Sequence, residues 1–381
     1  GLGNYYLYST NTTLETVTDQ KNRAKNTVSV VALNSSSLEN VNSLDGSKLG
    51  VLKTIGNEAT KKSLADLKKN NVTYSKKTYD NMLGMLKALY DGEVDAIVLN
   101  EAYRSNVCDL EDYTNFNNDT KVIHKTVYYT KENSSSLAVS DITSKPFNIL
   151  ISGNDSFGSL DENSRSDVDM LVTINPVTST ILLTSIPRDS YVKEVCNDYA
   201  CNYGAYDKLT HTGIYGVDTT KDTIENLLDI DINYVYRVNF TSMIDIVDAL
   251  GGIDIDVAEG MAVSRFYTNS TLEGVHEGTN HLDGKRALAY SRERKAYIDG
   301  DLQRARNQQQ VLQAMFKKAT SPEIIKNYTS LLKALIGAFD TNMTTQEITS
   351  FIKYQIQAKP SWKFEQFVLK GDNDLRMSAE L

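Results

Sequence analysis

The amino-acid sequence predicts an α/β protein built from two successive domains. Short apolar segments with strand character alternate with segments of helical period along the 381 residues, as in α/β proteins. A polar, Ser-rich stretch at residues 131–146 interrupts this alternation and is typical of a linker. We therefore expect a small α/β domain at residues 26–145 and a larger domain at residues 146–381, preceded by a linker or flexible terminus at residues 1–25.

The predicted first domain alternates strands with short helices, and this order favours a partly parallel sheet. It contains no Gly-rich phosphate loop, no His/Cys cluster and no convincing Ser/His/Asp order, so we expect a structural or partner-contacting accessory role. The expected strands are residues 26–34, 47–54, 71–76, 94–100 and 120–129, and the expected helices are residues 57–70, 80–92 and 101–107.

The composition excludes one class of partner. The net charge is −9 and the pI is near 5.1, whereas a non-specific nucleic-acid binder presents a basic face to the phosphate backbone. The sequence contains no run of about 18 apolar residues, the length that crosses a bilayer. It begins at Gly1 without an initiator Met, which suggests a fragment of a longer protein.

Acidic and basic side chains gather at the start of the second domain. The apolar residues 148–153 are predicted to form a strand, and the polar loop that follows carries Asp155. The next segment, SRSDVDMLVTINP, places Arg165, Asp167 and Asp169 at alternating positions. In a strand these three side chains would share one face.

A return strand and two downstream helices add further basic side chains. Residues 180–186 are predicted to form a strand that leads into Arg188 and Asp189. A short helix is expected at residues 283–290, and a longer helix opens with an acidic residue at Asp301. Four side chains from this region could face one anion, namely Arg292, Arg294, Arg304 and Gln308, the last two being four residues apart on one helical face.

Convergent carboxylates and arginines predict a site for a metal ion and phosphate. Magnesium prefers one or two protein carboxylates together with water and substrate phosphates. The planar guanidinium group offers paired donors to phosphate oxygens. The alternative is a cluster of surface ion pairs, which for any single Arg/Asp pair is the commoner outcome.

The order of these motifs resembles the LytR-CpsA-Psr family of Gram-positive envelope proteins, and within it the streptococcal CpsA-type proteins of capsule assembly. The resemblance covers residues 145–320 most strongly. It includes the strand leading to Asp155 and the segments SRSDVDMLV, IPRDS, KLTHTGIYG, GGIDIDV, LDGKRALAYSRER and DLQRARNQQ. These motifs are long and ordered, so the resemblance is specific.

The resemblance implies a fold and a set of site residues. The fold is an α/β/α sandwich around a mixed central sheet, preceded by a small α/β accessory domain. Asp155 and Asp167 match the family's ligands for Mg²⁺, with Mn²⁺ as a possible substitute, and these two with Arg165 and Arg188 form the expected catalytic set. Asp169 and Asp189 receive no role. The positions that match a grip on the substrate pyrophosphate are Arg165, Arg188, Arg292, Arg294, Arg304 and Gln308.

The resemblance also implies a reaction and its partners. The expected activity is a phosphotransferase that moves capsular polysaccharide, or a related anionic glycan, from a polyprenyl-pyrophosphate carrier to peptidoglycan. Two alternatives stay open: a polyprenyl-pyrophosphate phosphatase, and an extracellular lipid-phosphate-binding regulator of capsule assembly. The implied location is the Gram-positive cell membrane, with N-terminal membrane segments outside this sequence and the catalytic part outside the cell.

Other features carry weaker expectations. Cys196 and Cys201 are close enough to close a small disulfide loop, although free thiols are the alternative, and Cys108 is left over. A lone histidine such as His211 is more often structural than catalytic. Helices at residues 322–340 and 344–357 and a strand at residues 362–370 are expected in the tail. Their apolar stripes, with Val311, Leu312 and Met315, are most simply core, but the resemblance implies an apolar tunnel for the isoprenoid chain.

Overall fold

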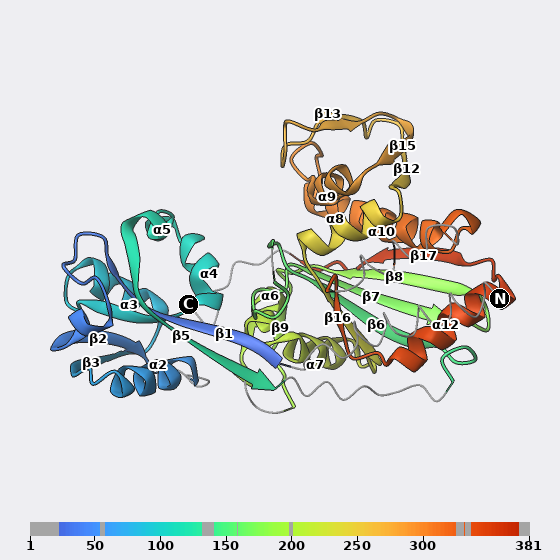
Figure 1. The fold of residues 1–381 in the computed structure, drawn as a ribbon. Helices are drawn as coiled ribbons and strands as arrows, with labels where there is room; N and C mark the ends of the chain where they lie inside the picture. Colours follow the sequence, from blue (N-terminus) through green and yellow to red (C-terminus); the bar gives the residue numbers. More distant parts are fainter. Residues whose placement is uncertain are drawn as a thin grey trace.

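A computed structural model shows two mixed sheets, each covered by helices (Figure 1). It describes residues 23–53, 58–131, 141–157, 159–197, 201–324, 331 and 337–372. The first sheet contains strands from the first 131 residues, and the second contains strands from Phe147 onward. The predicted α/β class is therefore confirmed.

The first sheet has five strands in the order β3-β2-β4-β1-β5. The strand β2 pairs in parallel with β3 and β4, whereas β1 pairs antiparallel with β4 and β5, so the prediction of a partly parallel sheet is confirmed. Its strands are β1 (Arg23–Leu33), β2 (Ser47–Leu52), β3 (Tyr74–Tyr79), β4 (Ala96–Asn100) and β5 (Thr120–Lys131), and its helices are η1 (Val41–Leu44), α2 (Glu58–Lys69), α3 (Met82–Tyr90), η2 (Glu101–Tyr103), α4 (Arg104–Cys108), η3 (Glu111–Tyr113) and α5 (Phe116–Asp119).

The first sheet and its helices, within residues 23–131, form the first unit. Side chains along β1 point alternately to the two faces of the sheet, so the unit has two hydrophobic cores. Val28 and Val30 point to the face covered by α2, where they join Leu67. Val31 points to the other face and joins Met85 of α3. This period of two is the reason that a strand can serve two helical layers at once.

The second sheet has six strands in the order β16-β11-β6-β7-β8-β17. Parallel pairs join β6 to β11 and β8 to β17, and the other pairs are antiparallel. The strands are β6 (Phe147–Gly153), β7 (Val168–Asn175), β8 (Thr180–Ile186), β11 (Tyr234–Val238), β16 (Asp340–Thr341) and β17 (Lys363–Val368).

Helices cover both faces of the second sheet, as the predicted sandwich requires. Leu150 of β6 packs with Ile224 of α7 (Val217–Leu228) on one face. Its neighbours Ile149 and Ile151 join the opposite core with Phe316 of α10 (Gly300–Ala319) and α12 (Thr345–Ala358). Short elements flank the α7 face, namely β9 (Tyr191–Lys193), β10 (Tyr206–Lys208), α6 (Leu209–Thr212) and η4 (Gly213–Tyr215).

A further layer lies on the outer side of α10 (Figure 1). It consists of two helices and two small two-stranded antiparallel sheets that share one core with α10. The core residues Val247, Phe266 and Leu282 are all buried. The elements are α8 (Phe240–Ala249), β12 (Ile253–Val257), β13 (Val263–Arg265), β14 (Glu273–Val275), β15 (Gly278–Leu282) and α9 (Gly284–Arg292).

Two predicted boundaries differ from those of the structure. The first strand begins at Arg23, which pairs with Lys131, so residues 23–25 belong to a strand and not to the predicted flexible terminus. The strand β7 begins at Val168, so Arg165 and Asp167 precede it and do not share a strand face with Asp169 as predicted. The helix predicted at residues 322–340 lies largely outside the described residues.

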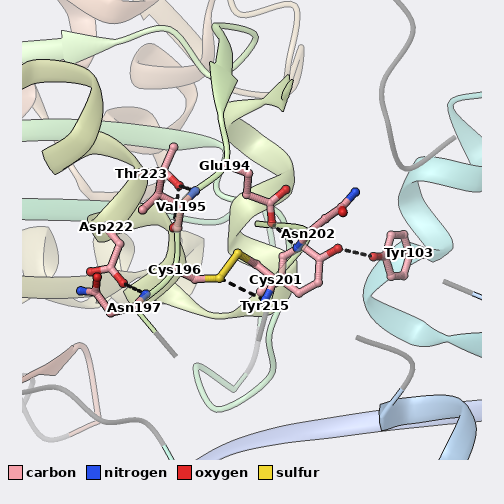
Figure 2. Close-up of a disulfide and its surroundings, with 10 residues drawn as sticks. All are labelled: Tyr103, Glu194, Val195, Cys196, Asn197, Cys201, Asn202, Tyr215, Asp222 and Thr223. Atoms are coloured by element: carbon pink, nitrogen blue, oxygen red, sulfur yellow. Dashed lines mark hydrogen bonds between the residues drawn. A yellow bond between two sulfur atoms is a disulfide. The ribbon is translucent and has the colours of Figure 1, made fainter. Parts of the chain in front are cut away.

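A disulfide joins Cys196 and Cys201, both of which are buried (Figure 2). The backbone on either side is tied to α7, because Val195 N donates to Thr223 Oγ1 and Asn197 N donates to Asp222 Oδ2. The predicted disulfide loop is therefore confirmed, and the alternative of free thiols at these two positions is wrong. Cys108 is a free thiol in the first unit.

Replacing both bridged cysteines by serine is expected to lower the free energy of unfolding by about 2 kcal/mol, because the short loop gains entropy when the chain unfolds. The measurement is the midpoint of urea unfolding under non-reducing conditions. Cys108→Ser is the matched control and should leave the midpoint unchanged. An unchanged midpoint in the double variant would show that the bridge adds no stability.

Candidate functional site

A small polar pocket of about 220 Å³ lies where β6 and β8 end and β7 begins, against α9 and α10. It contains five basic and three acidic side chains, so its lining carries net positive charge. Its volume is below the usual range for drug-sized ligands and suits a charged head group. The lining residues are Asp155, Asp167, Val168, Arg188, Tyr267, Thr268, Arg292, Glu293, Arg294, Lys295, Arg304 and Gln308.

The two predicted metal ligands lie side by side. Asp155 follows β6 and Asp167 precedes β7, and these antiparallel strands pair Gly153 with Val168. The backbone N–H of Asp155 donates to Asp167 Oδ2 at 2.9 Å. The Asp167 backbone N–H donates to the Gly153 carbonyl at 2.8 Å, so both acids are fixed by the start of the sheet ladder.

The electrostatic setting of Asp155 favours a bound cation. Desolvation by the surrounding protein raises the pKa of Asp155 although the residue is exposed to the pocket, and the neighbouring Asp167 charge raises it further. Arg292, Arg188 and Arg304 oppose this shift but do not cancel it. Two carboxylates that destabilise each other in this way are relieved by a divalent ion.

Arg188 and Arg292 approach the acids from different elements. Arg188 follows β8, and its Nη1 donates to Asp167 Oδ1 at 3.0 Å. Its buried Nε has no hydrogen-bond acceptor among the described residues. Arg292 ends α9, and its guanidinium lies 4.2 Å from the centre of the Phe240 ring. It forms no ion pair with any described side chain, so its donors are available to an anion.

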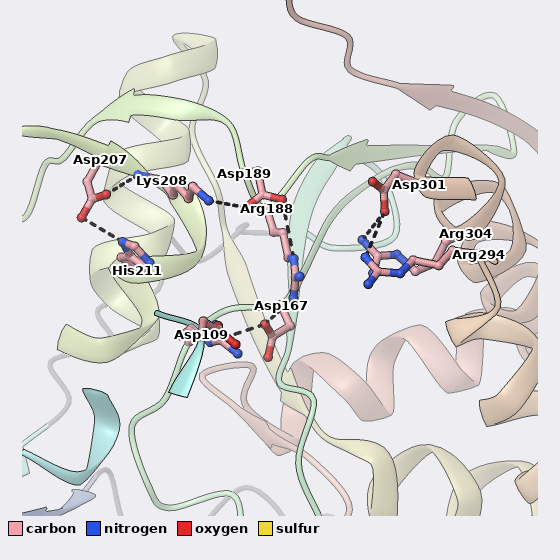
Figure 3. A network of polar contacts seen from close by, with 11 residues as sticks. Asp109, Asp167, Arg188, Asp189, Asp207, Lys208, His211, Arg294, Asp301 and Arg304 are labelled. Atoms are coloured by element: carbon pink, nitrogen blue, oxygen red, sulfur yellow. Dashed lines mark hydrogen bonds and ion pairs between the residues drawn. The ribbon is translucent and has the colours of Figure 1, made fainter. Parts of the chain in front are cut away.

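A second pair of arginines lies across the pocket (Figure 3). Asp301, on the first turn of α10, holds both: its Oδ1 is 3.2 Å from Arg304 Nη2 and 3.7 Å from Arg294 Nη1. Burial lowers the pKa of Arg304, and the charges of Arg188 and Arg294 add to this effect although Asp301 opposes it. Such crowding of positive charge is stabilised by a polyanion.

Three residues of the predicted acidic and basic cluster, Arg165, Asp169 and Asp189, lie outside the pocket lining. Arg165 points instead toward Asp109 of the first unit, while its Nε stays 4.0 Å from Asp167 Oδ1. Asp169 is buried behind the site and accepts a hydrogen bond from Ser166 at 2.6 Å. Burial raises the pKa of Asp169 to about 8 despite that hydrogen bond.

Some site residues were missed from the sequence. Glu293 is fully buried, and its carboxylate accepts from the backbone N–H groups of Tyr267 at 2.7 Å and Arg294 at 2.9 Å. It therefore fixes the turn that carries Arg294 and brings Tyr267 to the pocket. In the sequence, the only indication that Glu293 belongs to the site was its position between two predicted site arginines. Thr268 and Lys295 also line the pocket and had no signal.

The segment that carries Arg165 and Asp167 is positioned by the KLTHTGIYG motif. Thr210 N donates to the Arg188 carbonyl, and the Thr210 carbonyl accepts from Ser166 N at 2.9 Å. Gly213 packs so closely that an added Cβ would lie 2.5 Å from both Ser164 O and Ser166 N. Only glycine fits here, which explains the residue that follows LTHT.

Two histidines lie beside aspartates outside the pocket lining, as a structural role predicts for His211. His211 is buried, and its Nδ1 lies 2.9 Å from Asp207 Oδ2, away from the pocket lining. Asp254 is exposed and pairs with His281 at 2.7 Å. Within the described ranges no group of three or more His, Cys, Asp or Glu side chains could hold a metal ion.

The apolar side chains of α10 lie in cores on both sides of the helix. Val311 is buried and, with Met315, packs into the core shared with α8 and α9. Leu312 packs toward the second sheet. These positions agree with the core interpretation, and the tunnel implied by the family resemblance stays a prediction.

Gly213→Ala is expected to lower the free energy of unfolding by about 1–3 kcal/mol, because the new methyl group collides with backbone atoms that cannot move cheaply. Urea unfolding measures the change. Gly371→Ala is the control, since a Cβ there meets nothing within 4 Å. Equal stability of the two variants would show that the segment relaxes around the added methyl.

Known proteins resemble this chain in both sequence and fold. The polyisoprenyl-teichoic acid–peptidoglycan teichoic acid transferase TagU of Bacillus cereus (strain AH820) is 34% identical over 242 residues, which are 62% of this chain and 73% of that protein. TagT of Bacillus subtilis (strain 168), with the corresponding transferase name, is 32% identical over 240 residues, which are 62% of this chain and 72% of that protein.

Solved structures show the same architecture. The crystal structure of protein gbs0355 from Streptococcus agalactiae has 29% identity and a TM-score of 0.52, covering 60% of this chain and 78% of that chain. The crystal structure of B. subtilis TagV has 28% identity and a TM-score of 0.50, covering 62% and 88%. A family model described as the LytR_cpsA_psr family matches residues 112–379, well over half of the sequence, so the chain belongs to the LytR-CpsA-Psr family.

Proposed function

We propose that this protein is a magnesium-dependent phosphotransferase that moves capsular polysaccharide, or a related anionic glycan, from a polyprenyl-pyrophosphate carrier to peptidoglycan. The main support is the pocket in which Asp155 and Asp167 lie beside five basic side chains. Paired acids with surrounding arginines suit a metal-bound diphosphate better than they suit a neutral ligand.

The relatives support the carrier and the acceptor. TagU and TagT are named as transferases of teichoic acid from a polyisoprenyl carrier to peptidoglycan. We extend the polyprenyl carrier and the wall acceptor to this chain because it shares their family and sequence motifs. The choice of capsular polysaccharide as the glycan comes from the resemblance to CpsA-type proteins.

The acidic pair fits a magnesium or manganese ion. The carboxylates of Asp155 and Asp167 would provide two ligands, which leaves other positions for water and phosphate oxygens, as Mg²⁺ prefers. When bound, the ion would neutralise negative charge on the diphosphate. Asp167 is already oriented for this role by the Asp155 N–H and by Arg188.

The arginines would bind the diphosphate and stabilise the charge that develops as it is cleaved. Arg188 Nε has no hydrogen-bond acceptor among the described residues and is 3.9 Å from its ion-pair partner Asp189, while Arg292 has no ion-pair partner among those residues, so both can donate to phosphate oxygens. Arg294 and Arg304, shared on Asp301, would approach from the other side, with Gln308 one helical turn after Arg304. Preorganised donors of this kind stabilise a phosphoryl transition state.

The acceptor decides the reaction class. In transfer, the oxygen of a peptidoglycan sugar hydroxyl bonds to the sugar-linked phosphorus and gives up its proton, and polyprenyl phosphate leaves. When water attacks instead, the same pocket acts as a polyprenyl-pyrophosphate phosphatase. We propose transfer as the main reaction, with hydrolysis as its side reaction when the acceptor is absent.

A third candidate is a binding protein that senses lipid phosphate and regulates capsule assembly. The pocket argues against this reading, because a sensor does not need two acids beside the phosphate-binding arginines. A DNA-binding role has no support, since the chain is acidic overall and its basic side chains gather in a small pocket.

We also propose that the domain acts at the outer surface of the cell membrane. The Cys196–Cys201 disulfide fits an oxidising exterior. No helix in the described part of the chain is long and apolar enough to cross a bilayer. Anchoring through segments outside this sequence is an inference from the family.

Mass spectrometry of the purified protein under native conditions is expected to detect a bound polyprenyl phosphate or pyrophosphate. The Arg292→Ala/Arg294→Ala variant should lose it, because each charge-assisted hydrogen bond contributes about 1.5–3 kcal/mol. Arg306→Ala is the matched control: Arg306 is an exposed residue of α10 outside the pocket lining. The transferase proposal would be overturned by a protein that carries no lipid as purified and takes up no added lipid pyrophosphate in the presence of magnesium.

Asp155→Ala separates an enzyme from a sensor. Transfer of a lipid-linked glycan to a peptidoglycan acceptor should fall by about 10²-fold or more, while lipid binding through the arginines persists. Release of polyprenyl phosphate measures the first property and native mass spectrometry the second. Asp245→Ala, at an exposed position on α8, is the control. Unchanged turnover in Asp155→Ala would remove this acid from the mechanism.

A further inference from the structure

An acidic side chain of the first unit reaches the candidate metal ligands of the second. Asp109 follows α4, and its Oδ2 lies 2.5 Å from Arg165 Nη1. Arg165 Nε is 4.0 Å from Asp167 Oδ1. Figure 3 shows Asp109 next to Asp167, on the side opposite Arg294 and Arg304. Arg165 is therefore shared between two carboxylates from different parts of the fold.

The first unit also contacts residues 161–163, which lie shortly before Arg165 in the sequence. Lys25 of β1 donates its backbone N–H to the Asp161 carbonyl, and its Nζ lies 2.9 Å from Glu162 Oε1. Asn163 Nδ2 donates to Asn26 Oδ1 at 3.3 Å. Residues 161–167 thus run from a contact with β1 to the candidate cation site, and Asp109 contacts them near the end.

A second contact keeps α4 close to the catalytic part. The hydroxyl of Tyr103, at the end of η2 and directly before α4, lies 3.4 Å from the hydroxyl of Tyr215 in η4 (Figure 2). Tyr215 follows Gly213, which packs against the backbone of Ser164 and Ser166. The position of Asp109 is therefore tied to the same segment from two directions.

The charges around Asp167 indicate the effect of the ion pair between Asp109 and Arg165. Arg188 already occupies Asp167 Oδ1 at 3.0 Å, and a second guanidinium at that distance would compete strongly with a cation. Asp109 is the nearer partner of Arg165, at 2.5 Å against 4.0 Å. The Asp167 side chain is 6% exposed and that of Asp109 is 64% exposed, so the guanidinium is directed outward, away from the more buried acid.

We propose that Asp109 is a positioning residue of the active site, which withholds the Arg165 guanidinium from Asp167 and so keeps Asp167 available to a divalent cation. This inference rests on the proposed function, because it takes Asp155 and Asp167 as the cation ligands. The first unit then takes part in the cation site without touching the cation or the substrate.

Removal of the Asp109 charge is expected to weaken cation binding in two ways. Arg165 can close the remaining 4.0 Å gap to Asp167, which then lies between two guanidinium groups. The local charge also becomes more positive by one unit. Both effects weaken cation binding, and both are reduced by salt because Asp109 is exposed.

The test measures cation binding directly, with Mn²⁺ as the probe and the loss of the free-ion EPR signal as the readout. Asp109→Asn is expected to raise the dissociation constant about three- to tenfold at low salt, as for a partly exposed ion pair. Asp109→Glu should restore the constant to within about twofold, because it restores the carboxylate. Asp112→Asn, an exposed acid of η3, is the matched control and should leave the constant unchanged.

Repeating the measurement in an Arg165→Gln variant shows whether Asp109 acts through Arg165. In an Arg165→Gln chain, the further change Asp109→Asn should have less than about a twofold effect. The proposal is overturned when Asp109→Asn binds Mn²⁺ as tightly as the unsubstituted chain, when Asp112→Asn causes the same loss, or when the loss persists without Arg165. Thermal unfolding of each variant confirms that it is folded.

The result also separates this inference from the proposed function. An unsubstituted chain that binds no Mn²⁺ overturns both the metal site and the role of Asp109. An unsubstituted chain that binds Mn²⁺ while Asp109→Asn binds it equally well overturns only the role of Asp109.

Discussion

The structure depends on one electrostatic constraint: acids and arginines must be held close together without neutralising each other completely. Desolvation raises the pKa of Asp155 and the charge of Asp167 raises it further, while burial lowers the pKa of Arg304 and the charges of Arg188 and Arg294 add to that effect. Ion pairs within the pocket relieve only part of this charge. The charge that these ion pairs leave unbalanced would suit a cation beside the acids and a polyanion beside the arginines, which is the basis of the proposed function.

Rigid elements maintain this arrangement. The acids are fixed by the start of the β6–β7 ladder, while Arg188 follows β8 and is joined to the acidic segment through the backbone of Thr210. The basic side chains across the pocket depend on the buried carboxylate of Glu293, which accepts from three backbone N–H groups. At Gly300 an added Cβ would lie 2.3 Å from the Arg294 carbonyl, so the start of α10 can approach that turn only because the residue is glycine.

Arg165 shows how a site residue can keep its expected neighbour and lose its expected position. The motif SRSD predicted that Arg165 lies beside Asp167, and it does, at 4.0 Å. The sequence pattern did not reveal that Asp109, 56 positions earlier, is its closer partner, because no local period links two residues that far apart. Glu293 was missed for a similar reason: three backbone donors, which leave no trace in the amino-acid types, define its role.

The sequence by itself determined the α/β class, most strands and helices, and which acids and arginines follow which element. Those features depend on the period of apolar side chains and on residue types at strand and helix ends, which are local properties. Only the tertiary structure decided that Asp155, Asp167, Arg188 and Arg304 line one pocket while Asp169 and Arg165 do not. It did so because strand pairing, beginning at Gly153 and Val168, and the approach of the first unit set the direction of each side chain.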